Sequence, residues 1–234
     1  TVPEERLVGE REAFQEFVQT LKVPCPRELL LVQVPSVPEK HYDLATARNR
    51  GYYNYPPVGL LYLAAVAKEV DSRIEVRVLD LNFEINRSSH SDPFRYRIWQ
   101  DLLFQALDSC DAPHAGISCM FGTNKESFLE ICSFIRENFP NVPILAGGVQ
   151  ASYDFQELLA GDHCDIVFRK EGELQFKAFL ESCLAAKAVA VPRGAAFRLH
   201  REVREPSLPR GDAIPRAGGA FPPHARARHV GRLL

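Results

Sequence analysis

The stretch from residue 115 to residue 150 constrains the fold of this chain more than any other. An apolar run at residues 115–120 precedes a segment with helical periodicity at 124–138, and a second apolar run at 142–146 ends at two glycines. Apolar runs on either side of an amphipathic helix predict two parallel strands joined by a helical crossover. Such a pair is expected inside a larger sheet that is covered on both faces.

The same alternation continues through most of the chain. Predicted strands cover residues 28–34, 74–81, 115–120, 142–146 and 165–169, and predicted helices cover residues 58–70, 92–107, 124–138, 154–160 and 174–186. This order predicts an α/β, flavodoxin-like (Rossmann-like) fold, a five-stranded parallel sheet with helices on both faces. In the usual strand order, 2-1-3-4-5, a ligand binds at the carboxyl ends of the strands, near strands one and three.

Two further regions flank the predicted α/β domain of residues 27–186. Residues 1–26 are expected to form a helical extension whose amphipathic segment packs on the domain. The alternative is that this helix binds a partner. Residues 187–234 carry Lys187 and nine arginines against three acidic residues, whereas residues 1–186 carry 18 basic and 27 acidic residues. We expect this basic region to be a linker remnant with a hairpin at residues 195–204, followed by a disordered tail.

Composition excludes several classes of protein. No apolar run approaches the roughly 20 residues that a membrane-spanning helix needs, and the sequence does not begin with a signal-peptide pattern, so the cytoplasm is the expected location. The cysteines are scattered, without a Cys-x2-Cys pair. Zinc sites and redox dithiols need close spacing, and we therefore expect buried, reduced thiols.

The common phosphate-binding motifs are missing. The first predicted strand is followed by Pro-Ser-Val-Pro at residues 35–38, without the glycines of a dinucleotide-binding turn, and there is no Gly-x4-Gly-Lys-Ser/Thr loop. A flavodoxin-type phosphate loop is absent after this strand as well. A phosphoacceptor domain would need clustered aspartates there, and Asp80 and Lys170 are only a partial match to it.

Small residues at the ends of strands three and four offer another kind of site. Gly116, Ser118, Gly147 and Gly148 would leave a slot into which a flat or elongated group can push against the backbone. The serine hydroxyl can supply one hydrogen bond, and backbone N–H groups after the glycines can hold an anion such as a phosphodiester. For the glycine pair alone, a tight turn is an equally good explanation.

Taken together, the motifs resemble the cobalamin-binding domain of cobalamin-dependent radical SAM enzymes. That family has Ser-x-Leu after strand three and Gly-Gly after strand four, matched here by residues 118–120 and 147–148. The other family motifs are Pro-Pro-x-Gly-Leu-Leu-Tyr-Leu-Ala, Leu-Asp, Gly-Ile-Ser, Gly-Gly-x-His-Ala and Gly-Glu-Gly-Glu, and they correspond to residues 56–64, 79–80, 116–118, 147–151 and 170–173. The resemblance covers about residues 28–186, with the motifs in the same order.

The resemblance implies that the ligand is cobalamin (B12). Its dimethylbenzimidazole nucleotide tail would enter the slot, and the loops at 53–59, 119–124 and 171–173 would frame the corrin ring. The implied cofactor-binding residues are Tyr53, Pro57, Gly59, Ser118, Cys119, Met120, Phe121, Gly122, Thr123, Gly147, Gly148, Val149, Gln150, Ala151, Glu171, Gly172 and Glu173. Gln150 replaces the usual histidine, so a contact made there by an imidazole is not carried over.

The sequence lacks the motif that supplies a histidine to cobalt. The methionine-synthase branch carries Asp-x-His-x-x-Gly, whereas Asp162 and His163 have the wrong spacing, and His41 is better explained as a solvated loop residue. We therefore expect base-off, His-off cobalamin with no protein ligand to the metal. A weak or absent lower ligand suits methylcobalamin that gives its methyl group to a carbon radical.

The family also implies a second domain. There, a following barrel binds a [4Fe–4S] cluster through Cys-x3-Cys-x2-Cys and leaves one iron position for S-adenosylmethionine. No such triplet occurs here, so we expect a truncated or frame-shifted chain that is inactive alone, with the barrel lost in cis or supplied in trans. The competing hypothesis is a standalone binding or regulatory module that no longer binds B12. We expect no membrane or nucleic-acid partner, although a basic nucleic-acid-binding tail is a second explanation for residues 187–234.

Overall fold

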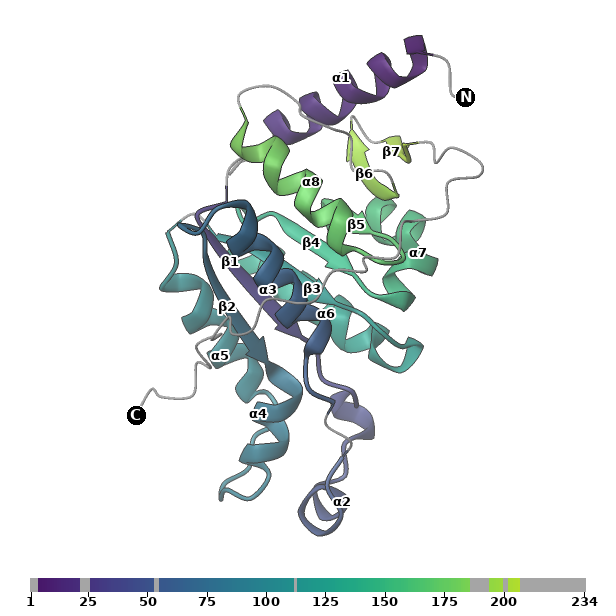
Figure 1. Ribbon diagram of the computed structural model, residues 1–234. Coiled ribbons are helices and arrows are strands. Elements are labelled where there is room, and N and C mark those ends of the chain that lie inside the picture. Colours follow the sequence, from purple (N-terminus) through teal and green to yellow (C-terminus); the bar gives the residue numbers. More distant parts are fainter. Residues whose placement is uncertain are drawn as a thin grey trace, which may run out of the picture.

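A seven-stranded sheet forms the middle layer of the protein (Figure 1). The computed structural model describes residues 4–21, 26–52, 55–111, 113–185, 194–199 and 202–206. Its strands are β1 (Glu28–Gln33), β2 (Glu75–Asp80), β3 (Pro113–Ser118), β4 (Ile144–Gly147), β5 (Ile166–Phe168), β6 (Ala195–Leu199) and β7 (Glu202–Arg204). They are arranged in the order β2-β1-β3-β4-β5-β6-β7, and β1 to β5 are parallel, whereas β6 and β7 are antiparallel to their neighbours.

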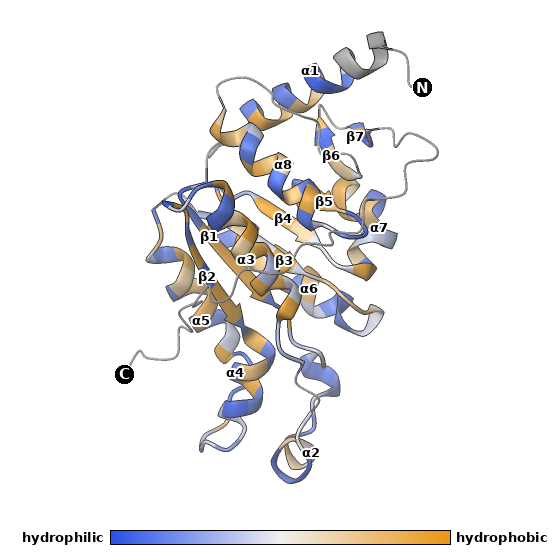
Figure 2. Cartoon of the chain, in the orientation of Figure 1, coloured by the Kyte–Doolittle hydropathy of each residue, from blue (hydrophilic) through white to orange (hydrophobic). Residues whose placement is uncertain are grey.

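Helices cover both faces of this sheet. They are α1 (Glu4–Thr20), α2 (Leu44–Asn49), α3 (Val58–Val70), α4 (Leu81–Ser88), α5 (Ile98–Asp108), α6 (Lys125–Asn138), α7 (Val149–Ala160) and α8 (Glu173–Leu184), with short 3-10 turns η1 (Glu39–His41) and η2 (Gly122–Asn124). Side chains of α1, α3 and α8 form the core on one face, and those of α4 to α7 form it on the other. Figure 2 shows the central strands as a mostly hydrophobic layer, as expected for a parallel sheet buried on both sides. None of the described helices is long and apolar enough to cross a bilayer.

The predicted parallel arrangement is confirmed for β1 to β5, but the predicted number of strands is wrong. The hairpin of β6 and β7, which the sequence placed outside the α/β domain, pairs with β5 through Ile166 opposite Phe197 and Phe168 opposite Ala195. Both faces of β6 are buried, because Phe197 packs with α1 and Ala196 belongs to the opposite core. The hairpin therefore covers the edge that the short strand β5 would otherwise expose.

Helix α1 is held to the sheet by aromatic contacts. The ring centroids of Phe14 and Phe17 lie 5.4 and 4.8 Å from that of Phe197 in β6. The prediction that the N-terminal helix packs on the domain is confirmed. The division of the chain at residues 26 and 186 stays a prediction, and the expected tail beyond residue 206 lies outside the described residues.

Several helices differ from the prediction. The sequence analysis missed α4, which starts directly after β2 because the Asp80 carboxylate caps it by accepting a hydrogen bond from Phe83 N–H. Helix α5 starts at Ile98 instead of residue 92, and α7 starts at Val149 instead of residue 154. The glycine pair thus leads straight into α7 and is not followed by an extended loop.

The long loop after β1 has more structure than its sequence indicated. It contains η1 and α2, and α2 is capped by Asp43, whose side chain accepts a hydrogen bond from Thr46 N–H at 2.6 Å. The Tyr42 ring lies at the centre of an aromatic cluster, 4.9 Å from Tyr52 and 5.1 Å from Tyr96 between ring centroids. These tyrosines therefore serve to fold the loop, which extends beyond the carboxyl ends of the strands (Figure 1).

His114, a buried residue of β3, should make the stability of the folded protein depend on pH. Both ring nitrogens are buried and have no hydrogen-bond partner in the part of the chain that the structure describes, and burial lowers the pKa of His114 to about 3. The native state thus holds this side chain neutral, whereas the unfolded chain binds a proton below about pH 6.5. Acidification from that pH towards the lower pKa therefore favours the unfolded chain, by about 1.4 kcal/mol per pH unit.

We expect His114→Leu to remove this part of the acid sensitivity. Between about pH 8 and pH 5 the variant should gain about 2 kcal/mol of unfolding free energy relative to the wild type. Denaturant unfolding at a series of pH values measures the difference. His90→Leu, at an exposed position, is the control and should follow the wild type. Parallel pH profiles for His114→Leu and the wild type would contradict the prediction.

Candidate functional site

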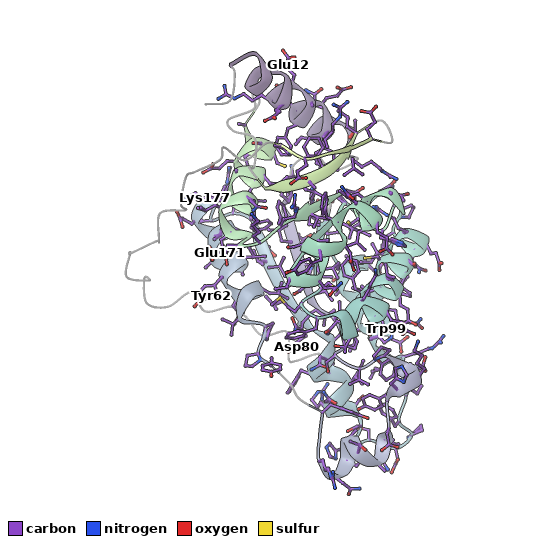
Figure 3. All side chains as sticks on the ribbon, turned by 90° about the vertical axis from the view of Figure 1, so that its right-hand side faces the viewer. Glu12, Tyr62, Asp80, Trp99, Glu171 and Lys177 are labelled. Carbon is purple, nitrogen blue, oxygen red and sulfur yellow. The ribbon has the colours of Figure 1, made fainter. Side chains whose placement is uncertain are left out.

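A cavity of about 740 Å³ opens at the carboxyl ends of the central strands, on the face covered by α3 and α8. Strands β1, β3, β4 and β5 form its floor, and the segments that follow them form its rim. In Figure 3, Glu171 marks the rim before α8, and Asp80 marks the end of β2. The cavity is therefore in the place that the parallel topology predicts for a ligand.

The strand register explains the shape of the floor. Gln33, Ser118, Gly147 and Phe168 are aligned across four neighbouring strands. Two residues earlier along the strands, Leu31, Gly116 and Leu145 form the next row. Because side chains two positions apart in a strand share a face, both rows face the cavity. The floor thus lacks side chains at the two glycines, between larger side chains.

The two floor glycines differ in what a side chain would meet. A Cβ at Gly116 would lie 2.6 Å from Leu31 Cδ2, whereas a Cβ at Gly147 would have only the Phe168 carbonyl oxygen nearby, at 3.8 Å. Gly147 therefore borders open space that its missing side chain leaves unfilled. This space can take a flat group that approaches the strand backbone.

Gly148 forms a tight turn between β4 and α7. Its φ of 103° is in a region that residues with a side chain rarely adopt. A Cβ added at this position would lie 2.4 Å from the Cys119 carbonyl oxygen. That oxygen accepts hydrogen bonds from the N–H groups of Gln150 and Ala151, at 3.1 and 3.3 Å. Two of the N–H groups expected to be available for an anion are therefore used by the protein.

Polar groups in the cavity fall into two sets. The amide of Asn82 accepts hydrogen bonds from Ser36 at 2.9 and 2.7 Å, and Asn124 Nδ2 donates to the Pro35 carbonyl at 3.3 Å, so these residues position the rim. In contrast, the Ser118 hydroxyl and the Gln33 side-chain amide have no hydrogen-bond partner among the described residues. These two groups are available to a ligand on the floor.

The rim is apolar on one side and charged on the other. Large side chains at the rim are strongly exposed, with exposed fractions of 55% for Tyr55, 54% for Phe121 and 52% for Val149. The rings of Tyr55 and Phe121 have centroids 6.5 Å apart. Lys170, Glu171 and Glu173 lie at the entrance to α8. Exposed apolar side chains around a cavity are typical of a binding surface.

Comparison with known proteins identifies this arrangement. A family model described as the B12 binding domain matches residues 46–180, which is more than half of the chain. The chain belongs to the B12-binding domain family. No curated protein matches the sequence. The match covers α3 to α7 and most of α8, while β1, which contributes Gln33 to the floor of the B12-binding domain, precedes it.

Solved structures with a similar fold include radical S-adenosylmethionine enzymes that bind cobalamin. TsrM from Kitasatospora setae, a methyltransferase solved with cobalamin and a [4Fe–4S] cluster, has a TM-score of 0.56 and 18% identity, over 77% of this chain and 31% of that one. The same enzyme with tryptophan and a SAM analogue has a TM-score of 0.52 and 19% identity, over 76% and 30%. OxsB with aqua-cobalamin and S-adenosylmethionine has a TM-score of 0.46 and 18% identity, over 77% and 22%. The chain thus spans less than a third of the length of these proteins.

Most of the residues expected to bind the cofactor line the cavity of the B12-binding domain. They are Pro57, Gly59, Ser118, Met120, Phe121, Thr123, Gly147, Gly148, Val149, Glu171, Gly172 and Glu173. Their convergence follows from the topology, because the carboxyl ends of parallel strands meet at one edge of the sheet. Tyr53 lies outside the described residues.

Four other expected residues do not line this cavity. Cys119 and Ala151 are buried in the core on the opposite face, where burial raises the pKa of the Cys119 thiol to about 12. The Gln150 amide donates to Asp154 Oδ2 at 2.8 Å. Gly122 lines a separate groove along α6. These residues shape the B12-binding domain near the cavity without facing it.

Sequence analysis missed several residues of the cavity, among them Leu31, Gln33, Asn82, Leu145, Phe168, Lys170 and Phe176. One signal was available, because Gln33 is a polar residue at the end of an otherwise apolar run. No histidine of the described chain lines the cavity, and His41 is exposed in η1. No group of three His, Cys, Asp or Glu side chains in the described residues could hold a metal ion.

Proposed function

We propose that this B12-binding domain binds cobalamin with its nucleotide tail in the cavity and its corrin ring on the rim. The observation that carries the proposal is the open space beside Gly147, which a side chain at that position would occupy and which the tail needs. The flat dimethylbenzimidazole base would lie against the strand backbone there. Ser118 and Gln33 would hydrogen-bond the tail, since both have side-chain groups without partners in the described chain.

The expected residues that lie on the rim of the cavity would contact the corrin ring in this proposal. Pro57, Gly59, Phe121, Val149 and Thr123 lie around the cavity, together with the other rim residues named above. A macrocycle with apolar faces and peripheral amides would cover the exposed apolar side chains of the rim. Burial of this surface would contribute about 25 cal/mol for each Å² of apolar area.

We further propose that cobalamin is bound base-off and His-off. A tail inserted between strands and helices holds its base away from cobalt, and no described histidine lines the cavity to replace it. When bound, the cofactor would supply a cobalt-carried methyl group. The protein's residues would hold the tail, orient the ring and leave its outer face open to a second domain.

The exposed rim supports a second domain as the partner. Family membership and the fold shared with TsrM suggest a radical SAM barrel, in cis or in trans, as the domain that would cover the rim and use the cofactor. Under this proposal the chain provides the cofactor-binding part of a methyltransferase-type protein. It would not catalyse methyl transfer alone.

Titration of the purified chain with hydroxocobalamin tests the proposed function. We expect a dissociation constant below about 100 μM, which corresponds to a binding free energy of about −5.5 kcal/mol or better. The visible spectrum of the bound cofactor should be that of base-off cobalamin. Size-exclusion chromatography after the titration checks that the cofactor stays with the protein. Absence of binding would favour the alternative of a standalone module that does not use B12, and a base-on spectrum would exclude the tail-in-slot arrangement.

A further inference from the structure

Lys170 has an unusual backbone conformation at the edge of the cavity. Its φ of 61° lies in the left-handed region, and the other described non-glycine residue with a positive φ is Asp162, at 59°. Aspartate enters this region more readily than residues with long side chains, and glycine enters it freely. Lysine at this position therefore strains the backbone in a way that glycine would avoid.

The surrounding structure holds this conformation in place. Lys170 N–H donates to Ser152 Oγ at 2.9 Å, and the same hydroxyl donates to the Gly148 carbonyl at 2.8 Å. On the preceding residue, Arg169 N–H donates to Gln175 Oε1 and its carbonyl accepts from Gln175 Nε2, at 3.0 and 2.6 Å. The backbone of Lys170 is thus fixed relative to both the glycine turn and α8.

The side chain of Lys170 supplies a positive charge at the cavity. Among the described residues that line the cavity, Lys170 is the only cation, and its ammonium forms no ion pair within the described chain. The neighbouring Arg169 is already engaged, because it pairs with Glu205 and lies 4.2 Å from the centroid of the Phe155 ring. A strained residue at a binding cavity, whose ammonium has no ion-pair partner in the described chain, suggests a functional constraint.

We propose that the Lys170 ammonium binds the phosphodiester of the cobalamin nucleotide loop. This inference rests on the proposed function and assigns one group of the ligand to one residue. The phosphodiester is the single anionic group of cobalamin, whose peripheral side chains are neutral amides. It joins the nucleotide base to the corrin, and Lys170 lies in the turn between Phe168, on the floor that would hold the base, and Glu171, on the rim that would hold the ring. A charge-assisted hydrogen bond to phosphate suits a lysine at this position.

Binding of two ligands to three variants tests the assignment. Lys170→Gln and Lys170→Gly should weaken hydroxocobalamin binding about tenfold, whereas Lys170→Arg should keep most of the affinity. Cobinamide, which lacks the phosphodiester and base, should bind all variants as it binds the wild type. Lys170→Gly should also raise the midpoint of thermal unfolding by about 3 °C, because it relieves the left-handed strain.

Salt dependence gives a second readout where cobinamide binds too weakly to titrate. Added salt should weaken hydroxocobalamin binding to the wild type and should have little effect on Lys170→Gln. Lys68→Gln makes the same change in charge on α3, away from the cavity, where Lys68 Nζ donates to the Ser72 carbonyl. This control should bind hydroxocobalamin like the wild type.

The possible failures can be told apart. If the wild type does not bind hydroxocobalamin, the proposed function itself is wrong. If the wild type binds but Lys170→Gln binds within about twofold of it at low salt, only the assignment of Lys170 is wrong. An equal loss for cobalamin and cobinamide, or an unchanged salt dependence in Lys170→Gln, would also overturn the assignment.

Discussion

Gly148→Ala is expected to destabilise the domain by about 4 kcal/mol and to lower the midpoint of thermal unfolding by about 10 °C. The backbone of Gly148, with φ 103° and ψ 169°, lies in a region that residues with a Cβ rarely adopt. The new Cβ would lie 2.4 Å from the Cys119 carbonyl oxygen. That oxygen cannot move away without losing its bonds from Gln150 and Ala151. Thermal and denaturant unfolding measure the loss.

Gly51→Ala is the matched control for this variant. Gly51 also has a positive φ, of 70°, but no atom of the described residues lies within 4 Å of the position that its Cβ would take. We expect it to lose about 1 kcal/mol, from backbone strain alone. Equal losses for Gly148→Ala and Gly51→Ala would show that close contact with the Cys119 carbonyl does not matter.

Gly147→Leu is expected to lower the affinity for cobalamin at least about 100-fold while the domain stays folded. Gly147 has a backbone that other residues can adopt, and, apart from its chain neighbours, the nearest described atom to its Cβ position is 3.8 Å away. A leucine side chain would extend into the cavity and occupy the space proposed for the nucleotide tail. Titration with hydroxocobalamin measures the affinity, and denaturant unfolding shows whether stability changes by less than about 1 kcal/mol.

Two further variants calibrate this experiment. Gly147→Ala adds a single methyl group and should cause a smaller loss of affinity than leucine. Gly9→Leu makes the same substitution on α1, where no described atom lies within 4 Å of the Cβ position, and should leave binding unchanged. If Gly147→Leu binds cobalamin within about threefold of the wild type, the tail does not occupy this part of the cavity.

The sequence predicted the parallel part of the fold well because each buried strand is a short apolar run beside a helical period. It could not place β6, since an apolar run such as residues 195–199 does not reveal which sheet edge it will pair with. Antiparallel pairing to β5 depends on contacts of Phe197 with α1, which are remote in the sequence. The start of α4 was hidden because Asp80 both ends a strand and caps a helix.

The cavity was predicted best at the strand ends and least well along the strands. Ser118 and Gly147 follow from the rule that parallel strands present their carboxyl ends together. Cys119 was included through its motif, although side chains alternate along an extended chain and that of Cys119 must oppose Ser118. Lys170 lines the cavity with its backbone in the left-handed conformation, and a lysine in a sequence does not indicate that conformation.

The hydrogen bonds of the Ser152 hydroxyl affect how strongly a ligand would bind. By donating to the Gly148 carbonyl and accepting from Lys170 N–H, it joins the turn after β4 to the turn after β5. These two turns form one preorganised wall, whose conformational entropy is lost when the chain folds. Binding against such a wall does not require either turn to be ordered again, so more of the contact free energy contributes to affinity.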